Sequence, residues 1–213
     1  LIDHEPPFRI ITELAENGIH WKRGETLKLL HTKTSTIELF STPDDVDIDV
    51  DEFNRRVITE PFNRVVCNAL AEQIDPSLPG KTLVFCATDS HADMVVHLLK
   101  EAFTAQYDAV EDDAVLKITG AADKPMQLIR KFKNERLPSV AVTVDLLTTG
   151  IDVPGIVNLV FIRRIRSRIL YEQMLGRATR LCEDLYGDGQ PKERFMIFDA
   201  VDLYSTLEPY TSM

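Results

Sequence analysis

The chain of 213 residues has the composition of an ordinary globular protein, with 44% hydrophobic and 27% charged residues. Its net charge of −10 speaks against a protein that coats nucleic acid nonspecifically. No apolar run approaches the roughly 20 residues of a membrane span, so no membrane partner is expected, and the first residues lack the basic flank and apolar core of a secretion signal. The three cysteines lie far apart without a Cys-x-x-Cys pair, so no disulfide framework or zinc site is expected, and a cytoplasmic location is predicted.

The first 80 residues differ in pattern from the rest of the chain. Residues 18–30 are expected to form a hairpin that turns near Arg23-Gly24. An almost wholly acidic run follows at residues 44–52, and residues 53–74 place apolar side chains at helical spacing. We interpret residues 1–80 as a connecting or inserted lobe that consists of a hairpin, an acidic loop and a helix.

Beyond this lobe, apolar segments rich in strand formers alternate with amphipathic helical segments. Predicted strands cover residues 82–87, 115–119, 139–144, 156–162 and 194–199, and predicted helices begin at Asp89 or Ser90, near Pro125 and at Ser167, the last running to Ala178. Strands that are apolar almost throughout imply an α/β fold whose parallel sheet is buried on both faces. Ligands gather at the carboxyl ends of such strands, which singles out the loops at 87–90, 119–124 and 145–155.

The loop that follows the third of these strands carries hydroxyls, a glycine and a carboxylate in the order Thr148-Thr149-Gly150-Ile151-Asp152. A glycine here lets the backbone approach a ligand, and the polar side chains can bond phosphate or ribose. Taken by itself, an ordinary turn after a strand is the simpler interpretation of this loop.

A second motif, from Gln173 through Gly176-Arg177 to Arg180, is predicted to place two arginines on one helix face, since three residues are nearly one turn. Two guanidinium groups directed together suit a polyphosphate, and one of them can act as an arginine finger. A solvated arginine face that forms surface ion pairs fits this motif equally well when it is taken alone.

In this order and on these elements, the motifs resemble the conserved blocks of superfamily 2 helicases. Residues 83–88 resemble motif IV, Thr119-Gly120 the small motif after it, residues 149–152 motif V and residues 173–180 motif VI. The resemblance implies a RecA-like parallel sheet flanked by helices over residues 81–213. It also implies that this domain is the second of two motor domains, and that it closes over ATP and Mg²⁺ bound jointly with an N-terminal motor domain of the same chain.

The resemblance further implies a role for each matching residue. Asp152 approaches the ribose, and Gly150 shapes the loop that faces the nucleotide. Gln173 and Arg177 lie at the cleft between the two domains, and Arg180 reaches the γ-phosphate as the arginine finger. Contacts to the nucleic-acid backbone are implied for Thr88, Thr119, Gly120 and Thr148.

Longer stretches resemble the R (motor and restriction) subunits of type I restriction enzymes, namely residues 53–63, 142–154, 173–182, 184–189 and 195–199. Such subunits translocate double-stranded DNA with ATP, cleave it far from the recognition site, and assemble with methylation and specificity subunits. Two alternatives stay open. One is another superfamily 2 helicase of DNA repair or remodelling, and the other is a non-catalytic platform that binds DNA or protein.

Some patterns imitate functional sites. Gly80-Lys81-Thr82 resembles the end of a phosphate-binding P-loop, but it precedes a strand where a P-loop would follow one. His91 and His97 are too far apart for a metal pair of i,i+4 spacing, so we interpret both as surface residues and predict no metal site. Without a P-loop or an Asp-Glu magnesium motif, the chain is expected to be part of a longer protein and not to hydrolyse ATP by itself.

Overall fold

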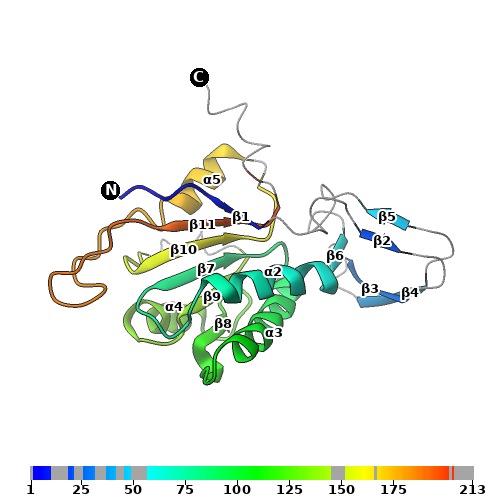
Figure 1. Ribbon diagram of the computed structural model, residues 1–213, viewed down its shortest axis with the longest axis horizontal. Helices are drawn as coiled ribbons and strands as arrows, with labels where there is room; N and C mark the ends of the chain where they lie inside the picture. The colour runs from blue at the N-terminus through cyan, green and yellow to red at the C-terminus, as the bar shows by residue number, and fades with distance from the viewer. Residues whose placement is uncertain are drawn as a thin grey trace.

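The central element of the protein is a sheet of six strands in the order β1-β11-β10-β7-β9-β8 (Figure 1). All neighbouring strands in it are parallel, which confirms the predicted parallel sheet. The strands are β1 (Phe8–Arg9), β7 (Lys81–Phe85), β8 (Val115–Lys117), β9 (Val140–Thr143), β10 (Ile156–Phe161) and β11 (Met196–Asp199). The computed structural model describes residues 2–10, 58–144, 152–165, 167–201 and 203, and the backbone of residues 19–21, 26–31, 37–41, 46–48 and 57.

Helices cover both faces of this sheet. One face packs against α2 (Glu60–Gln73) and α3 (Asp89–Gln106), and the other against α4 (Pro125–Asn134) and α5 (Arg168–Leu175). A short 3₁₀ helix, Asp112–Ala114, leads into β8. Among the described residues, no helix is both long and apolar enough to cross a bilayer.

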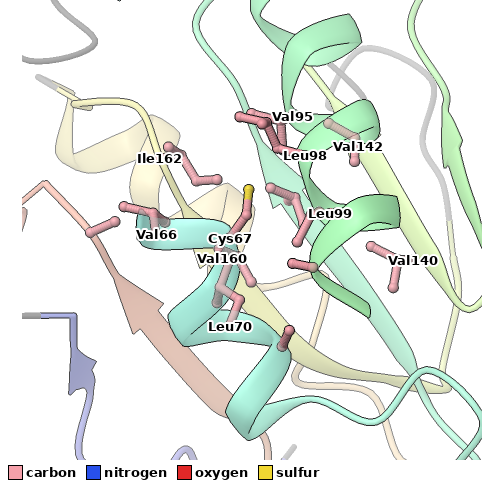
Figure 2. Close-up of a cluster of buried hydrophobic side chains, with 14 of the residues drawn as sticks. Val66, Cys67, Leu70, Val95, Leu98, Leu99, Val140, Val142, Val160 and Ile162 are labelled. Carbon is pink, nitrogen blue, oxygen red and sulfur yellow. The ribbon is translucent and has the colours of Figure 1, made fainter. Parts of the chain in front are cut away.

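Strand β7 shows why the central strands are apolar throughout. Successive side chains of a strand point to opposite faces of the sheet. Val84 and Cys86 accordingly belong to the core under α2 and α3, whereas Leu83 and Phe85 belong to the core under α4 and α5. Figure 2 shows how the first of these cores is filled by side chains of both helices, of β9 and of β10 with the residue after it, namely Val66, Cys67, Leu70, Val95, Leu98, Leu99, Val140, Val142, Val160 and Ile162.

The strands near the N-terminus pair differently from the prediction. Strand β2 (Ile19–Trp21) pairs antiparallel with β5 (Val46–Ile48). Strand β3 (Thr26–His31) pairs with β4 (Ile37–Ser41) and β6 (Val57–Thr59) in a separate sheet. The hairpin predicted within residues 18–30 is therefore wrong. A glycine between two short strands signals a change of direction, but it does not select the partner strand.

Two segments of the predicted lobe also take part in the main sheet domain. Strand β1 extends the sheet beside β11, and α2 packs against α3. Helix α2 begins later than its predicted start at residue 53, because residues 57–59 form β6 and Pro61 occupies the first turn, where a missing N–H costs nothing. The boundary at residue 80 stays a prediction, but the contacts of β1 and α2 are with the sheet.

Candidate functional site

Helix α5 ends before the two arginines of the second motif. The hydroxyl of Ser167 caps its first turn by accepting from the N–H of Leu170 at 3.3 Å. Tyr171 and Met174 face the core, and the ring of Tyr171 lies 5.6 Å from that of Phe161. The last helical residue is Leu175.

The predicted end of α5 at Ala178 is therefore wrong. The N–H groups of Arg177 and Ala178 bond to carbonyls three residues back, at 3.1 and 2.9 Å, which is the tighter pattern of a closing turn. Arg177 thus lies in this turn and Arg180 beyond it, so the two arginines do not share one helix face. Gln173 is exposed on α5, and Arg177 is half-buried.

The structure brings Asp152 and Arg180 together. The Nε of Arg180 lies 3.4 Å from Oδ1 of Asp152, and their side chains are 62% and 52% exposed. An ion pair this exposed contributes between zero and about 1 kcal/mol, because water screens it. Gly150 and Thr148, the other two predicted residues of this loop, lie outside the described residues.

This pair lies at the amino end of the sheet. The sequence instead predicts ligand-binding loops at the carboxyl end. The N–H of Lys81, at the start of β7, donates to the carbonyl of Gly155 at 2.8 Å, which places residues 152–155 beside the beginnings of the strands. Helix α5 runs back from the carboxyl end of β10, so the chain after it reaches the same amino end.

Thr88, Thr119 and Gly120 lie at the opposite, carboxyl end. Thr88 is the N-cap of α3, a position that the sequence assigned to Asp89 or Ser90, and its hydroxyl accepts from the N–H of His91 at 3.1 Å. The hydroxyl of Thr119 donates to Oδ1 of Asp89 at 2.6 Å, so the two motifs are joined.

Asp89 is the centre of this carboxyl-end cluster. Lys117 donates to its Oδ2 at 2.7 Å and pairs with Asp93 at 2.6 Å. The bonds from Lys117 and Thr119 hold the pKa of the Asp89 carboxyl below its ordinary value. Thr119 is buried and its hydroxyl donates its proton to Asp89, whereas the hydroxyl of Thr88 acts as an acceptor in its bond with His91. Gly120 is exposed, with open space about its Cα.

His91 is fully buried, so its interpretation as a surface residue is wrong. The N–H of Ala87 donates to its Nδ1 at 3.1 Å, and its Nε2 donates to Oδ1 of Asn63 at 2.9 Å. Asn63 in turn donates to the carbonyl of Thr59 at 2.8 Å. This network ties the start of α2 to the start of α3. His97, with a side chain 71% exposed, does lie on the surface.

Two buried lysines were missed by the sequence analysis. Lys81 begins β7, which agrees with its exclusion as a P-loop residue, and its Nζ binds the carbonyls at the end of α4. The Nζ of Lys192 binds the carbonyls of Pro154, Ala178 and Arg180. Burial lowers the pKa of Lys192 to about 8, which leaves the amine protonated at neutral pH. A single lysine belongs to no periodic pattern, so the burial of these two side chains could not be predicted from the sequence.

Residues 64–182 match the family described as helicase conserved C-terminal domain. The whole chain is 49% identical to the endonuclease subunit of the type I restriction enzyme EcoKI from Escherichia coli strain K12, and it covers 18% of that protein. It is 28% identical over 139 residues to the EcoAI endonuclease subunit of Escherichia coli, covering 64% of this chain and 17% of that one. The chain thus spans less than a fifth of the length of these two relatives.

Solved structures show the same fold. A fragment assigned as the HsdR subunit of a type I restriction enzyme from Vibrio vulnificus YJ016 superposes with a TM-score of 0.57 at 27% identity, over 71% of this chain and 29% of that one. Domain 2 of the DEAD-box helicase Mss116p, bound to an RNA duplex, gives a TM-score of 0.54 at 18% identity, over 72% and 57%. The second likeness concerns the fold alone, and together they confirm the RecA-like expectation. The chain belongs to the family of helicase conserved C-terminal domains and is related to the endonuclease subunits of type I restriction enzymes.

Proposed function

We propose that this chain is the second motor domain of an ATP-dependent translocase of double-stranded DNA, the R subunit of a type I restriction endonuclease. The observation that carries the proposal is the 49% identity with the EcoKI subunit over the whole chain. The helicase family match covers residues 64–182 only, so membership in that family does not account for the similarity of the flanking segments. This favours a restriction subunit over another superfamily 2 helicase and over a non-catalytic platform.

In this proposal, ATP with Mg²⁺ binds between this domain and an N-terminal motor domain of the same protein. The weak, exposed pair between Arg180 and Asp152 can open, so that Arg180 turns to the γ-phosphate and Asp152 to the ribose. As an arginine finger, Arg180 would raise kcat by roughly 10³ to 10⁵. Gln173 and Arg177 contribute to the same cleft, and Gly150 shapes the nucleotide-facing loop.

DNA is proposed to bind at the carboxyl end of the sheet. The hydroxyl of Thr88 and the main-chain N–H of Gly120 would donate to backbone phosphates, with Thr148 from the neighbouring loop. Thr119 would hold Asp89 and its neighbours in place, because its own proton is already donated. Contacts of this kind position the duplex without reading its sequence, which leaves recognition to the methylation and specificity subunits proposed as partners.

The test uses the full-length protein and its DNA-stimulated ATPase activity. Arg180→Ala is expected to lower kcat at least about 10³-fold while the binding of a fluorescent ATP analogue is largely retained. Arg168→Ala is the matched control, because Arg168 is an exposed arginine on α5 whose Nε lies 2.7 Å from Glu172, and it should keep the parental kcat. Near-normal hydrolysis by Arg180→Ala would contradict the proposed role.

A triplex displacement assay on long duplexes tests translocation directly. The full-length protein, assembled with the methylation and specificity subunits proposed as its partners, should displace a third strand in the presence of ATP without separating the duplex. Strand separation without displacement would instead indicate a helicase of repair or remodelling. A protein that neither binds nor hydrolyses ATP would indicate the non-catalytic platform. The 213-residue chain by itself is expected to show no ATP hydrolysis.

A further inference from the structure

A buried lysine lies between the second motif and the last strand of the sheet. Lys192 is 1% exposed. Its Nζ donates to the carbonyl of Ala178 at 2.7 Å and to those of Pro154 and Arg180 at 3.0 Å each. An ammonium group has three protons, so these three bonds use all of them. Lys192 therefore acts as a junction of main-chain segments that are far apart in the sequence.

The bonded carbonyls belong to the two segments that carry Asp152 and Arg180. Pro154 lies two residues after Asp152, and Arg180 offers its own carbonyl. The main-chain N–H of Lys192 also donates to the carbonyl of Cys182 at 2.8 Å, which holds the chain just after Arg180. One residue thus fixes the backbone on both sides of the Arg180–Asp152 pair.

The pair cannot set this geometry by itself. Both side chains are more than half exposed, and their 3.4 Å contact competes with water and salt. Helix α5 cannot set it either, because its last residue, Leu175, lies five positions before Arg180. Hydrogen bonds from a charged donor, such as the Lys192 ammonium, are roughly twice as strong as those between neutral groups. Val153 and Ala178 also pack in one core, and Lys192 adds the hydrogen bonds that tie the two segments to one another.

We propose that Lys192 is a positioning residue that holds the backbones of Arg180 and Asp152 at a fixed separation, so that Arg180 can reach ATP bound to the partner motor domain. The inference rests on the proposed function of Arg180 as an arginine finger. Catalysis by such a group depends on its placement, and a shift of about 1 Å can cost roughly 100-fold in rate. Removal of the Lys192 ammonium leaves one buried and two partly buried carbonyls without this donor and releases the segment around Arg180.

Lys81 offers a matched control, because it has the same chemistry at another place. Its Nζ donates to the carbonyls of Glu135 at 2.6 Å and of Arg136 and Pro138 at 2.8 Å. These carbonyls lie just past the end of α4. The three bonds of the Lys81 Nζ therefore hold that turn and not the segment around Arg180. Loss of either ammonium should therefore destabilise the protein similarly, but only one loss should disturb Arg180.

The experiment compares Lys192→Met and Lys81→Met in the full-length protein, at a temperature well below the Tm of both. Both substitutions should lower Tm by similar amounts. Lys192→Met should lower the kcat of ATP hydrolysis at least about tenfold, with KM for ATP within about threefold, because ground-state binding does not need the finger. Lys81→Met should keep kcat within about twofold of the parent. Equal kcat in the two variants would overturn the proposal.

Arg180→Ala in the same series separates this inference from the proposed function. Parental turnover in Arg180→Ala would refute the finger itself. An inactive Arg180→Ala beside a fully active Lys192→Met would refute only the positioning role. If the methionine variants do not fold, Lys192→Gln and Lys81→Gln take their place, because an amide keeps two donors. A kcat of Lys192→Gln below about a third of that of Lys81→Gln would support the role, and equal values would overturn it.

Discussion

His91 is expected to make the domain sensitive to mild acid. Burial lowers the pKa of its imidazole to about 3, whereas a histidine in the unfolded chain titrates near 6.5. Between these two values the unfolded chain binds a proton that the folded chain excludes, so stability decreases as the pH falls below about 6.5. Each pH unit costs about 1.4 kcal/mol. From pH 7 to pH 5, this residue alone should lower the free energy of unfolding by about 2 kcal/mol.

Urea unfolding of the 213-residue chain, followed by circular dichroism between pH 5 and pH 8, measures this effect. His91→Gln should be less stable at pH 7, because it disturbs the bonds to Ala87 and Asn63. Between pH 7 and pH 5, however, the free energy of unfolding of this variant should decrease by about 2 kcal/mol less than that of the parent. His97→Gln, an exposed histidine on the same helix, should keep the parental pH dependence. If His91→Gln and the parent lose the same free energy, the assigned burial and neutral state of His91 are refuted.

Other substitutions test the carboxyl-end cluster and the domain boundary. Thr88→Ala should lower the free energy of unfolding by about 1 kcal/mol in urea titrations, because α3 loses its cap, while Thr88→Ser should retain most of it. Thr119→Val should cost about 1 kcal/mol and raise the pKa of Asp89 in an NMR titration, since the carboxylate loses one hydrogen bond. A chain that begins at Lys81 lacks α2 and β1, so calorimetry should show no cooperative transition, in contrast to the 213-residue chain.

The elements that were predicted well are the strands buried on both faces of the sheet. Strands β7, β9 and β10 are covered on both faces, so their sequences are continuous apolar runs that can be recognised without knowing the fold. The end of α5 is different. Arg177 and Ala178 are good helix formers, and local sequence favours a longer helix. The chain nevertheless leaves the helix after Leu175, and the carbonyl of Ala178 bonds to Lys192, a contact that comes from a distant part of the sequence.

The error about His91 could have been avoided. Counting along α3 from His91 leads to Val95, Leu98 and Leu99, which is the spacing of one helix face, and all of these side chains are buried. A histidine on that stripe should have been assigned to the core, with a partner for each ring nitrogen. The partner Asn63 lies on another helix, however, and no local pattern points to it.

The split of the candidate residues between two ends of the sheet follows from its topology. Consecutive parallel strands require a connection that crosses from the carboxyl end of one strand to the amino end of the next. The connection that contains Asp152 leaves β9 at one end and enters β10 at the other, and the connection that contains Arg180 does the same between β10 and β11. The described residues proposed for DNA belong to the connections that follow β7 and β8, whereas Asp152 and Arg180 belong to those that follow β9 and β10. Strands β7, β9 and β10 all contribute to the core around Phe161 and Tyr171, which anchors these connections. With both ends fixed to one core, we expect the domain to move as a unit when ATP is hydrolysed, so that the motion lies between the two motor domains.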